Sequence, residues 1–482
     1  MADVTHEQYD DNLAIWEKCE DSIQGEDALH KADKGMKGKY LRVLNPSDKS
    51  AFNVERNNAY VYGARFQNFS ASTLQGFLGM AFRKPPVLPE LPGEIDYILD
   101  NADGSGLSLV QQSRKVLSEV AKKGRDGGLV EMPNTEGKQV TRAQVAEGLR
   151  ATIKLYCAEN ILDWYPNEPT AKNPLSYVRL REMATKFVAV GEKEKVERHI
   201  VLLLDKGKYR QEIYEQDESG EWDLKEEYTP MTSSGVPFDH IPFHFCGSLN
   251  NNPDVDKPLI LDIVNVNLGM YQEDANQRAS SFAYSAATAH IADNQFFNWF
   301  HGGGDDGQHK EVRFGESSVI VTGSDGKVNI VSPPENSLSG AIKESDLAVL
   351  IALGAQVIQP GGAAETAEAV RLKAGSTASK LSVAVQNVED FYNNALQDVA
   401  MFMGATIPET EQLEMNQEFF DERVSPEMLD KMVAAWLAGA ISKNVLDQKL
   451  VEGSVIPENT DLEKMNEEVD EAIPDDGEPA AI

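Results

Sequence analysis

The feature that most constrains this chain is a narrow apolar stripe that runs for about nine helical turns in its C-terminal third. The stripe residues follow one another at steps of four, four, three, four, three, four, three, four and three. Such steps place side chains on one face of an α-helix, so the spacing predicts one long helix with a single buried face. Few monomers of this size need so long a helix, whereas a ring of subunits would. The stripe consists of Val370, Ala374, Ala378, Leu381, Val385, Val388, Tyr392, Ala395, Val399 and Phe402.

The rest of the chain shows helical and extended patterns in separate blocks. The clearest helix has Ser108 as a candidate N-cap and Gly124 as its stop signal. Strand-like segments with turn signals at Lys206–Gly207 and Ser219–Gly220 follow further on. Separate blocks predict an α+β fold and argue against a doubly wound one. Helices are expected within 103–128, 257–292, 339–403 and 425–453, and strands within 178–246 and 311–334.

The net charge of −33 excludes some functions. Proteins that hold DNA tightly neutralise its phosphates with Lys and Arg. A chain this acidic is therefore a poor candidate for static DNA binding. The three cysteines are far apart in the sequence and imply no disulfide framework, which suits a reducing cytoplasm. The sequence shows no signal peptide and no apolar run near the ~18 residues of a membrane helix. From Glu458 onward, ten acids and one lysine predict a solvated tail.

A Pro-Gly-Gly loop precedes the long stripe, in the sequence LGAQVIQPGGAAETAEAVRLKAGS. Loops of this kind can hold phosphates, but a nucleotide-binding P-loop needs GxxxxGK[ST]. Here Gly361 and Gly362 are followed by no lysine before Lys373. Glu365 at the helix start would also repel a phosphate there. A nucleotide site is therefore not expected.

Two histidines and a cysteine lie close together in the segment DHIPFHFC, namely His240, His244 and Cys246. An H-x₃-H pair binds a metal best on a helix, but Pro242 argues against a helix here. On an extended strand the two histidines would share a face but lie roughly 13 Å apart. Histidines packed in a β-rich region are the favoured interpretation. Because no catalytic triad or metalloprotease motif is found either, no enzyme activity, cofactor or metal is predicted.

Several segments in a constant order resemble the portal proteins of tailed bacteriophages, in the group that carries an FRKPP signature. The resemblance covers about residues 80–404 and leaves 1–57 and the end of the chain uncovered. Each motif alone is of modest specificity, but their order and spacing together are specific. The matching segments are LGMAFRKPP, ADGSGLSLVQQSRKVLSEVAKKGRDGGLVEMP, FDHIPFHFCG, PLILDIVNVNLGMYQ and LGAQVIQPGGAAETAEAVRLKAGSTASKLSVAVQNVEDFYNNALQDVAMFMG.

The resemblance implies a dodecameric ring at one capsid vertex of the virion, assembled in the host cytoplasm. It also implies a portal-like subunit built of wing, stem, β-rich clip and α-helical crown. The implied segments are an N-terminal segment (1–57), wing and start of the stem (58–177), clip (178–246), stem helix (247–292), further wing (293–355), tunnel loop (356–364), crown helices (365–456) and an acidic C-terminal tail (457–482).

The same resemblance implies the partners and the site. Double-stranded DNA would pass through the channel without sequence specificity, and the expected protein partners are the terminase motor, head–tail connector proteins and the major capsid protein. The tunnel-loop residues would be Gln356, Gln359, Pro360, Gly361 and Gly362, with Arg371 and Lys373 as channel or inter-subunit charges. The alternatives are another phage head–tail adaptor or structural protein, and an acidic helical scaffold without a DNA role.

Overall fold

The computed structural model confirms an α+β fold. Residue contacts divide the chain into two units. Unit 1 comprises Met1–Gly79 and Pro86–Met415, and unit 2 comprises Met80–Pro85 and Asn416–Ile482. The described residues are 4–133, 149–166, 175–189, 192–216, 219–285, 288–294, 297, 325–331, 338–354, 367–419, 426–452 and 464–465.

A three-stranded antiparallel sheet lies in the core of unit 1, with β1 (Arg125–Glu131) between β2 (Thr152–Cys157) and β8 (Phe243–Gly247). Helices α5 (Leu109–Lys123) and α10 (Ala367–Met403) pack against each other and against this sheet. Hydrogen bonds link these layers. The Tyr392 hydroxyl donates to the Gln112 side chain, and that side chain donates to the Ile153 carbonyl.

The two helices match the sequence analysis closely. Ser108 caps α5 in a capping box with Gln111, and Gly124 ends the helix at a φ of 73°. A Cβ atom at Gly124 would also lie 2.0 Å from the Asp256 carbonyl oxygen. Both the positive φ and this close approach therefore require glycine at the position. In α10, every stripe residue from Leu381 to Phe402 is buried. The long helix and the buried face of its second half are therefore confirmed.

Four strands predicted from the sequence join a fifth in an antiparallel sheet of order β3-β4-β5-β6-β7. A tight turn at Lys206 and Gly207, both with positive φ, joins β5 to β6 as the sequence indicated. The edge strand β7 is mostly exposed, whereas β3 is largely buried. The strand bounds are β3 Ile161–Pro166, β4 Leu175–Ala189, β5 Glu192–Asp205, β6 Lys208–Gln216 and β7 Trp222–Tyr228.

The N-terminal region of unit 1 is helical, although its sequence has only weak helical patterns. Trp16 of α1 is fully buried, and its indole N–H donates to the Lys123 carbonyl 2.9 Å away. Lys123 in turn contacts Glu119 and Glu159 at 2.9 and 2.8 Å. Tertiary packing of this kind stabilises helices whose own sequence signal is weak. The elements are α1 Glu7–Gln24, α2 Glu26–Asp33, α3 Ala51–Gly63, α4 Phe69–Ala81 and the short 3₁₀ helices η1 Asp96–Leu99 and η2 Ala158–Asn160.

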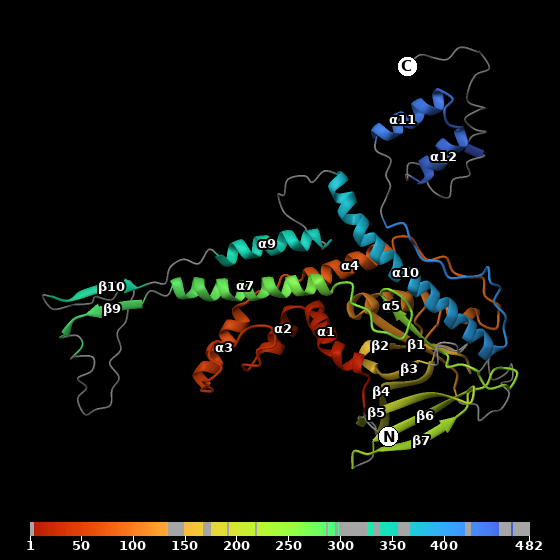
Figure 1. The fold of residues 1–482 in the computed structure, drawn as a ribbon, viewed down its shortest axis with the longest axis horizontal. Coiled ribbons are helices and arrows are strands. Elements are labelled where there is room, and N and C mark those ends of the chain that lie inside the picture. The colour runs from red at the N-terminus through yellow and green to blue at the C-terminus, as the bar shows by residue number, and fades with distance from the viewer. Residues whose placement is uncertain are drawn as a thin grey trace. The chain divides into compact units, whose positions relative to one another are not determined.

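Helices α7 (Leu261–Ser285) and α9 (Leu338–Ala352) form a hairpin that carries a small sheet (Figure 1). The sheet pairs β9 (Thr288–Ala292) with β10 (Lys327–Val331) in antiparallel register. The sequence predicted one helix over 257–292, but the helix ends at Ser285 and its last predicted turns form β9 instead. The β-branched residue Thr288 and the pairing with β10 favour the extended state there. Of the predicted strands within 311–334, the described part is β10.

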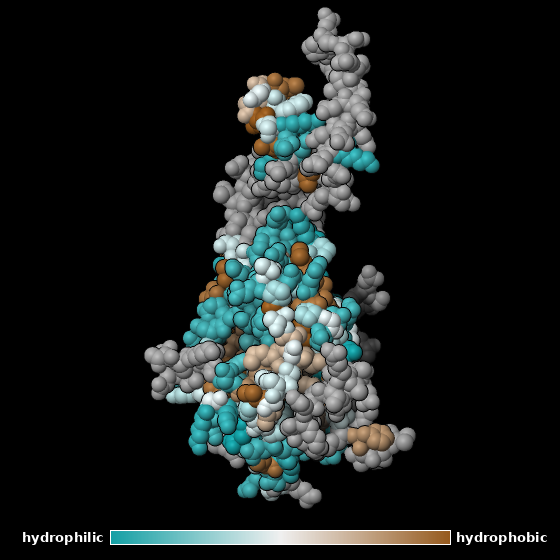
Figure 2. All heavy atoms as spheres, turned by 90° about the vertical axis from the view of Figure 1, so that its right-hand side faces the viewer, coloured by the Kyte–Doolittle hydropathy of each residue, from teal (hydrophilic) through white to brown (hydrophobic). Residues whose placement is uncertain are grey.

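In unit 2, part of the FRKPP segment lies against the residues that follow Met415. The Asn416 side-chain amide donates to the Met80 carbonyl at 3.0 Å, and Lys84 pairs with Glu418 at 2.8 Å. Helices α11 (Pro426–Leu437) and α12 (Lys443–Glu452) follow, within the region predicted as helical. No helix among the described residues of the chain is long and apolar enough to cross a membrane. Hydrophilic residues make up most of the described surface in the view of Figure 2.

Strand β1 begins with two buried charged residues. The Arg125 guanidinium lies between the Trp164 and Phe245 rings, 3.9 and 4.0 Å from their centres, and donates to the Pro253 carbonyl. Burial lowers the pKa of Arg125 to about 9, and the charges of Asp254 and Asp256 oppose this shift. Asp126 is 1% exposed, and within the described residues neither of its carboxylate oxygens accepts a hydrogen bond from another group. Burial, followed by the charge of Glu119, raises the pKa of Asp126 well above its usual value.

Replacing Asp126 with asparagine is therefore expected to stabilise unit 1 more at pH 8 than at pH 4. The raised pKa means that ionisation favours the unfolded chain increasingly as the pH rises above about 4, and asparagine removes that ionisation. The gain should be clearly larger at pH 8 than at pH 4. Denaturant unfolding at both pH values measures it, with Asp96→Asn at an exposed aspartate as the control. Equal gains at the two pH values would contradict a neutral, buried Asp126.

Candidate functional site

The predicted tunnel loop connects α9 to α10. Gln356, Gln359, Pro360, Gly361 and Gly362 all lie outside the described residues. Arg371 and Lys373 lie in α10, whose backbone is described at those positions although their side chains are not. The structure therefore describes the two helices that hold the loop, and the prediction for the loop itself remains a prediction.

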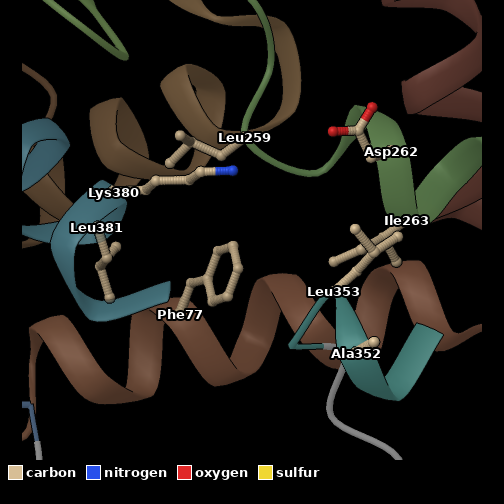
Figure 3. Close-up of a pocket in the computed structure, with 8 residues that line it drawn as sticks. All are labelled: Phe77, Leu259, Asp262, Ile263, Ala352, Leu353, Lys380 and Leu381. Carbon is tan, nitrogen blue, oxygen red and sulfur yellow. The ribbon is translucent and has the colours of Figure 1, made fainter. Parts of the chain in front are cut away.

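The end of α9 and a later turn of α10 meet at a small cavity of ≈ 100 Å³ (Figure 3). Leu353, just beyond the end of α9, and Leu381 of α10 line the same cavity. Gly354 follows with a φ of 82°, a conformation that glycine adopts without strain and that ends α9. Leu381 lies about four turns into α10, so the cavity joins the end of α9 to the body of that helix. The other lining residues are Phe77, Leu259, Asp262, Ile263, Ala352 and Lys380.

The cavity is built for packing. Phe77, Ile263 and Leu381 are each at most 5% exposed and form its apolar part. Asp262 belongs to an ion pair with Lys257, whose ammonium lies 2.7 and 2.8 Å from its two oxygens. Ligand pockets usually hold about 300–1,000 Å³, so this cavity has room for a few waters only. We interpret it as a packing contact that holds the end of α9 against α10.

Helices α7 and α9 run antiparallel, as their contacts show. Ile263 and Met270 of α7 pack with Leu350 of α9, and further along Lys343 of α9 donates to Asp274 of α7 at 2.8 Å. Asp274 also accepts from the Arg278 guanidinium at 2.6 Å and from the Arg65 backbone N–H at 2.8 Å. Burial alone would raise the pKa of Asp274, but these hydrogen bonds outweigh it and hold the pKa below its usual value. An apolar cluster and one multiply bonded carboxylate therefore hold the hairpin together.

A second cluster joins α10 to the segment before β8. Asp398 of α10 is 3% exposed and accepts hydrogen bonds from His240 and His244, each 2.8 Å from one of its two oxygens. His240 also contacts Asp239 at 2.9 Å. Burial opposes protonation of His240, but the two aspartates outweigh it and raise its pKa to about 9. Burial would raise the pKa of Asp398, yet the two histidines hold it below its usual value. The cluster is therefore an ionic link with a carboxylate between two imidazoles.

The histidine pair was treated correctly as a packing feature, but its geometry was predicted wrongly. The two rings reach one carboxylate because β8 begins only at Phe243, so the chain before it is not an extended strand. Cys246 is fully buried elsewhere on β8. Within the residues described, no group of three or more His, Cys, Asp or Glu side chains could hold a metal ion. Asp398 could not be predicted from the sequence, because a polar residue beside a buried stripe does not indicate which residue it contacts.

Residues 258–403 match the model of a protein family described as a domain of unknown function, DUF4055. The match begins just before α7 and ends with α10, so it comprises the hairpin, the predicted tunnel loop and the long helix. A search of curated proteins finds no significant match to the chain.

Proposed function

We propose that the chain is the subunit of a portal ring at one vertex of a tailed-bacteriophage capsid. The ring would provide the channel for packaging and ejection of viral DNA. The order and spacing of the motifs over residues 80–404 support this proposal. The expected partners follow from it: the terminase motor, head–tail connector proteins, the major capsid protein and the DNA itself.

The observation that carries the proposal is the arrangement within residues 258–403. A two-helix hairpin bears a small sheet, and the predicted tunnel loop lies between α9 and α10. Helix α10 then runs back into the core and packs on β1 and β8. A channel subunit needs such a unit, because a loop that borders moving DNA has to be held by rigid elements. The cavity at Leu381 and, further along α10, the Asp398 cluster hold this helix to the rest of unit 1.

Two regions of the chain are candidates for the clip that would face the motor. The sequence analysis placed the clip at 178–246, most of which forms strands β4 to β7. The β9–β10 sheet at the end of the α7–α9 hairpin is the second candidate (Figure 1). We favour β9–β10, because a docking element must project, whereas parts of β4 and β5 are buried in unit 1, as at Val178, Leu180 and Leu202. Helices α7 and α9 would then both belong to the stem.

The charge of the chain suits a channel through which DNA slides. A loop that binds each phosphate would hold the DNA in place, and the predicted tunnel loop Gln356–Ala364 carries no lysine or arginine. The net charge of −33 likewise disfavours tight, static binding. DNA would therefore pass with few fixed contacts.

Purified protein is expected to form rings, with a mass many times the 53.0 kDa of one chain. Light scattering measures the mass, negative-stain microscopy shows the rings, and the protein alone should turn over no ATP. A monomer at micromolar concentration, or ATP hydrolysis by the purified chain, would overturn the proposal and favour the adaptor or scaffold alternatives. A reconstruction of the ring also decides between the clip candidates, because the correct one projects at one end of the channel.

A further inference from the structure

The side of α9 that faces away from α7 is exposed and apolar. Leu338, Ile342 and Val349 are 67%, 37% and 43% exposed. On the opposite side of the helix, Leu347 and Leu350 pack against α7. A helix that is apolar on both sides is typical of one that is covered on both sides. The outer face of α9 is defined here as Leu338, Ala341, Ile342, Ser345, Ala348 and Val349, a set without a charge.

A second surface lies between α3 and α7. It is a groove of ≈ 700 Å³, called the α3–α7 groove below. Its floor is apolar and largely buried, and exposed guanidinium groups stand at its rim. In a chain with a net charge of −33, this clustering of arginines is unusual. The floor includes Tyr60, Ala275 and Ala279, and the rim includes Arg42, Arg56 and Arg278.

The two surfaces lie on opposite sides of α7. The α7 residues that face α9, such as Met270 and Gln277, are about half a helical turn away from Ala275 and Ala279, which line the groove. Figure 1 shows the same arrangement, with α9 and α3 on either side of α7. One copy of the chain therefore presents the outer face on one side and the groove on the other.

The surfaces also lie at the same level along the hairpin. Lys343 of α9 contacts Asp274 of α7, and Gly340 lies beside Gln277. The stretch of α9 that contains Ile342 is therefore level with the stretch of α7 that lines the groove. Rotation about an axis parallel to the hairpin keeps this level, so neighbouring copies in a ring would bring the two surfaces together.

We propose that the outer face of α9 in one copy packs into the α3–α7 groove of the next copy. This inference rests on the ring proposed above and names its contact surfaces. Charge complementarity favours a second copy as the occupant. Most contacts between such acidic chains would oppose acid to acid, whereas this one sets an uncharged face, with exposed Glu344 beside it, against three arginines. Because the two surfaces differ, the contact is heterologous, the type that closes into rings.

Cysteine cross-linking tests the contact. One chain carries Ile342→Cys on the outer face and another carries Ala59→Cys, which lines the groove on α3. The native thiols will compete little, because burial raises the pKa of Cys19 and Cys157 to about 12 and that of Cys246 also. Mild oxidation of the mixed chains should give a disulfide-linked dimer on a non-reducing gel, and neither chain alone should. A chain with both substitutions should give a ladder of linked subunits.

The outcomes separate this inference from the proposed function. Rings without the mixed-chain disulfide would overturn the contact and leave the portal proposal standing, as would be seen if another segment of the chain covered α9. Cross-linking of Ile342→Cys with itself would show a symmetric contact and would also overturn the inference. A monomeric wild-type chain would overturn both proposals. Met183→Cys, on an exposed part of β4, replaces Ile342→Cys in the control mixture and should give no dimer.

A second variant measures the energy of the same contact. Ile342→Lys should raise the protein concentration needed for half-maximal assembly on the order of tenfold or more, because it removes apolar burial and adds a positive charge beside Arg42 and Arg56. Ile342 is exposed, so the thermal melting of the dissociated chain should stay unchanged. Assembly at the wild-type concentration would contradict the proposed packing.

Discussion

Replacing Gly128 with valine is expected to destabilise unit 1 by about 3 kcal/mol and to displace α10 from the sheet. A Cβ atom on Gly128 would lie 2.5 Å from the Phe391 ring, closer than packed atoms approach. Phe391 has no free space into which to move, because it is 1% exposed and packs edge-on against Tyr392. The branched side chain would therefore push the helix off its support. Denaturant unfolding measures the loss, and near-ultraviolet circular dichroism reports the aromatic packing.

The control for this variant is Gly93→Val, at a loop glycine whose Cβ would meet nothing within 4 Å. It should change stability by less than about 0.5 kcal/mol. A Gly128→Ala chain should be partly rescued by Phe391→Leu, because the smaller side chain vacates the space that the new methyl group needs. Full stability in Gly128→Val, or no coupling in the double variant, would show that α10 does not pack on β1 as described.

The parts of the fold that sequence predicted well are those determined by local periodicity. The stripe of α10 is buried from Leu381 onward, and α5 begins and ends at the capping residues that its sequence indicates. The β5–β6 turn forms at Lys206 and Gly207 because few other backbone shapes suit this dipeptide between two strands. Each of these features depends on residues within a few positions of one another.

Other parts depend on contacts that no local pattern reveals. Strand β1 begins inside the region 103–128 that was predicted as helical, and it needs its two glycines because Phe243 and Phe391 approach the backbone from distant segments. Helix α7 ends at Ser285 because β9 pairs with a strand more than thirty residues later. Trp16 is buried beside α5, where its indole N–H donates a hydrogen bond to the Lys123 carbonyl more than a hundred residues away. Long-range packing, which a single sequence does not encode visibly, decided all of these.

The candidate site divides in the same way. The position of the predicted tunnel loop between two helices follows from Pro360 and the periodic segments on either side, and α9 and α10 are found there. The small cavity combines residues from α4, α7, α9 and α10, which lie far apart in the sequence, so no local sequence motif predicts it. The outer face of α9 could be identified only after the structure showed which side of the helix packs against α7. The sequence therefore predicted the break between the two helices, and the assignment of the tunnel loop remains a prediction.

Replacing Asp398 with asparagine is expected to destabilise unit 1 by about 3 kcal/mol at pH 6 and by much less at pH 10. The raised pKa of His240, about 9 against an ordinary 6.5, means that its protonated form stabilises the folded chain. This contribution is complete below about pH 6.5 and is lost as the pH rises through about 9. Asp398 has a lowered pKa, so its contribution persists above about pH 4 and is lost only in stronger acid. The ionic link is therefore strongest between about pH 4 and 6.5, where its removal costs most.

Unfolding of the wild type and of Asp398→Asn across pH 5–10 measures this difference directly. Asp390→Asn is the matched control, since Asp390 lies on the same helix but is exposed, and it should change stability by less than about 0.5 kcal/mol at any pH. A second variant, His240→Gln, should remove most of the pH dependence of the difference, because it removes the group that titrates near pH 9. A constant difference from pH 5 to 10 would show that His240 is neutral in the folded chain. The link between α10 and the segment before β8 would then be held by ordinary hydrogen bonds, and alkali would not loosen the helix that follows the predicted tunnel loop.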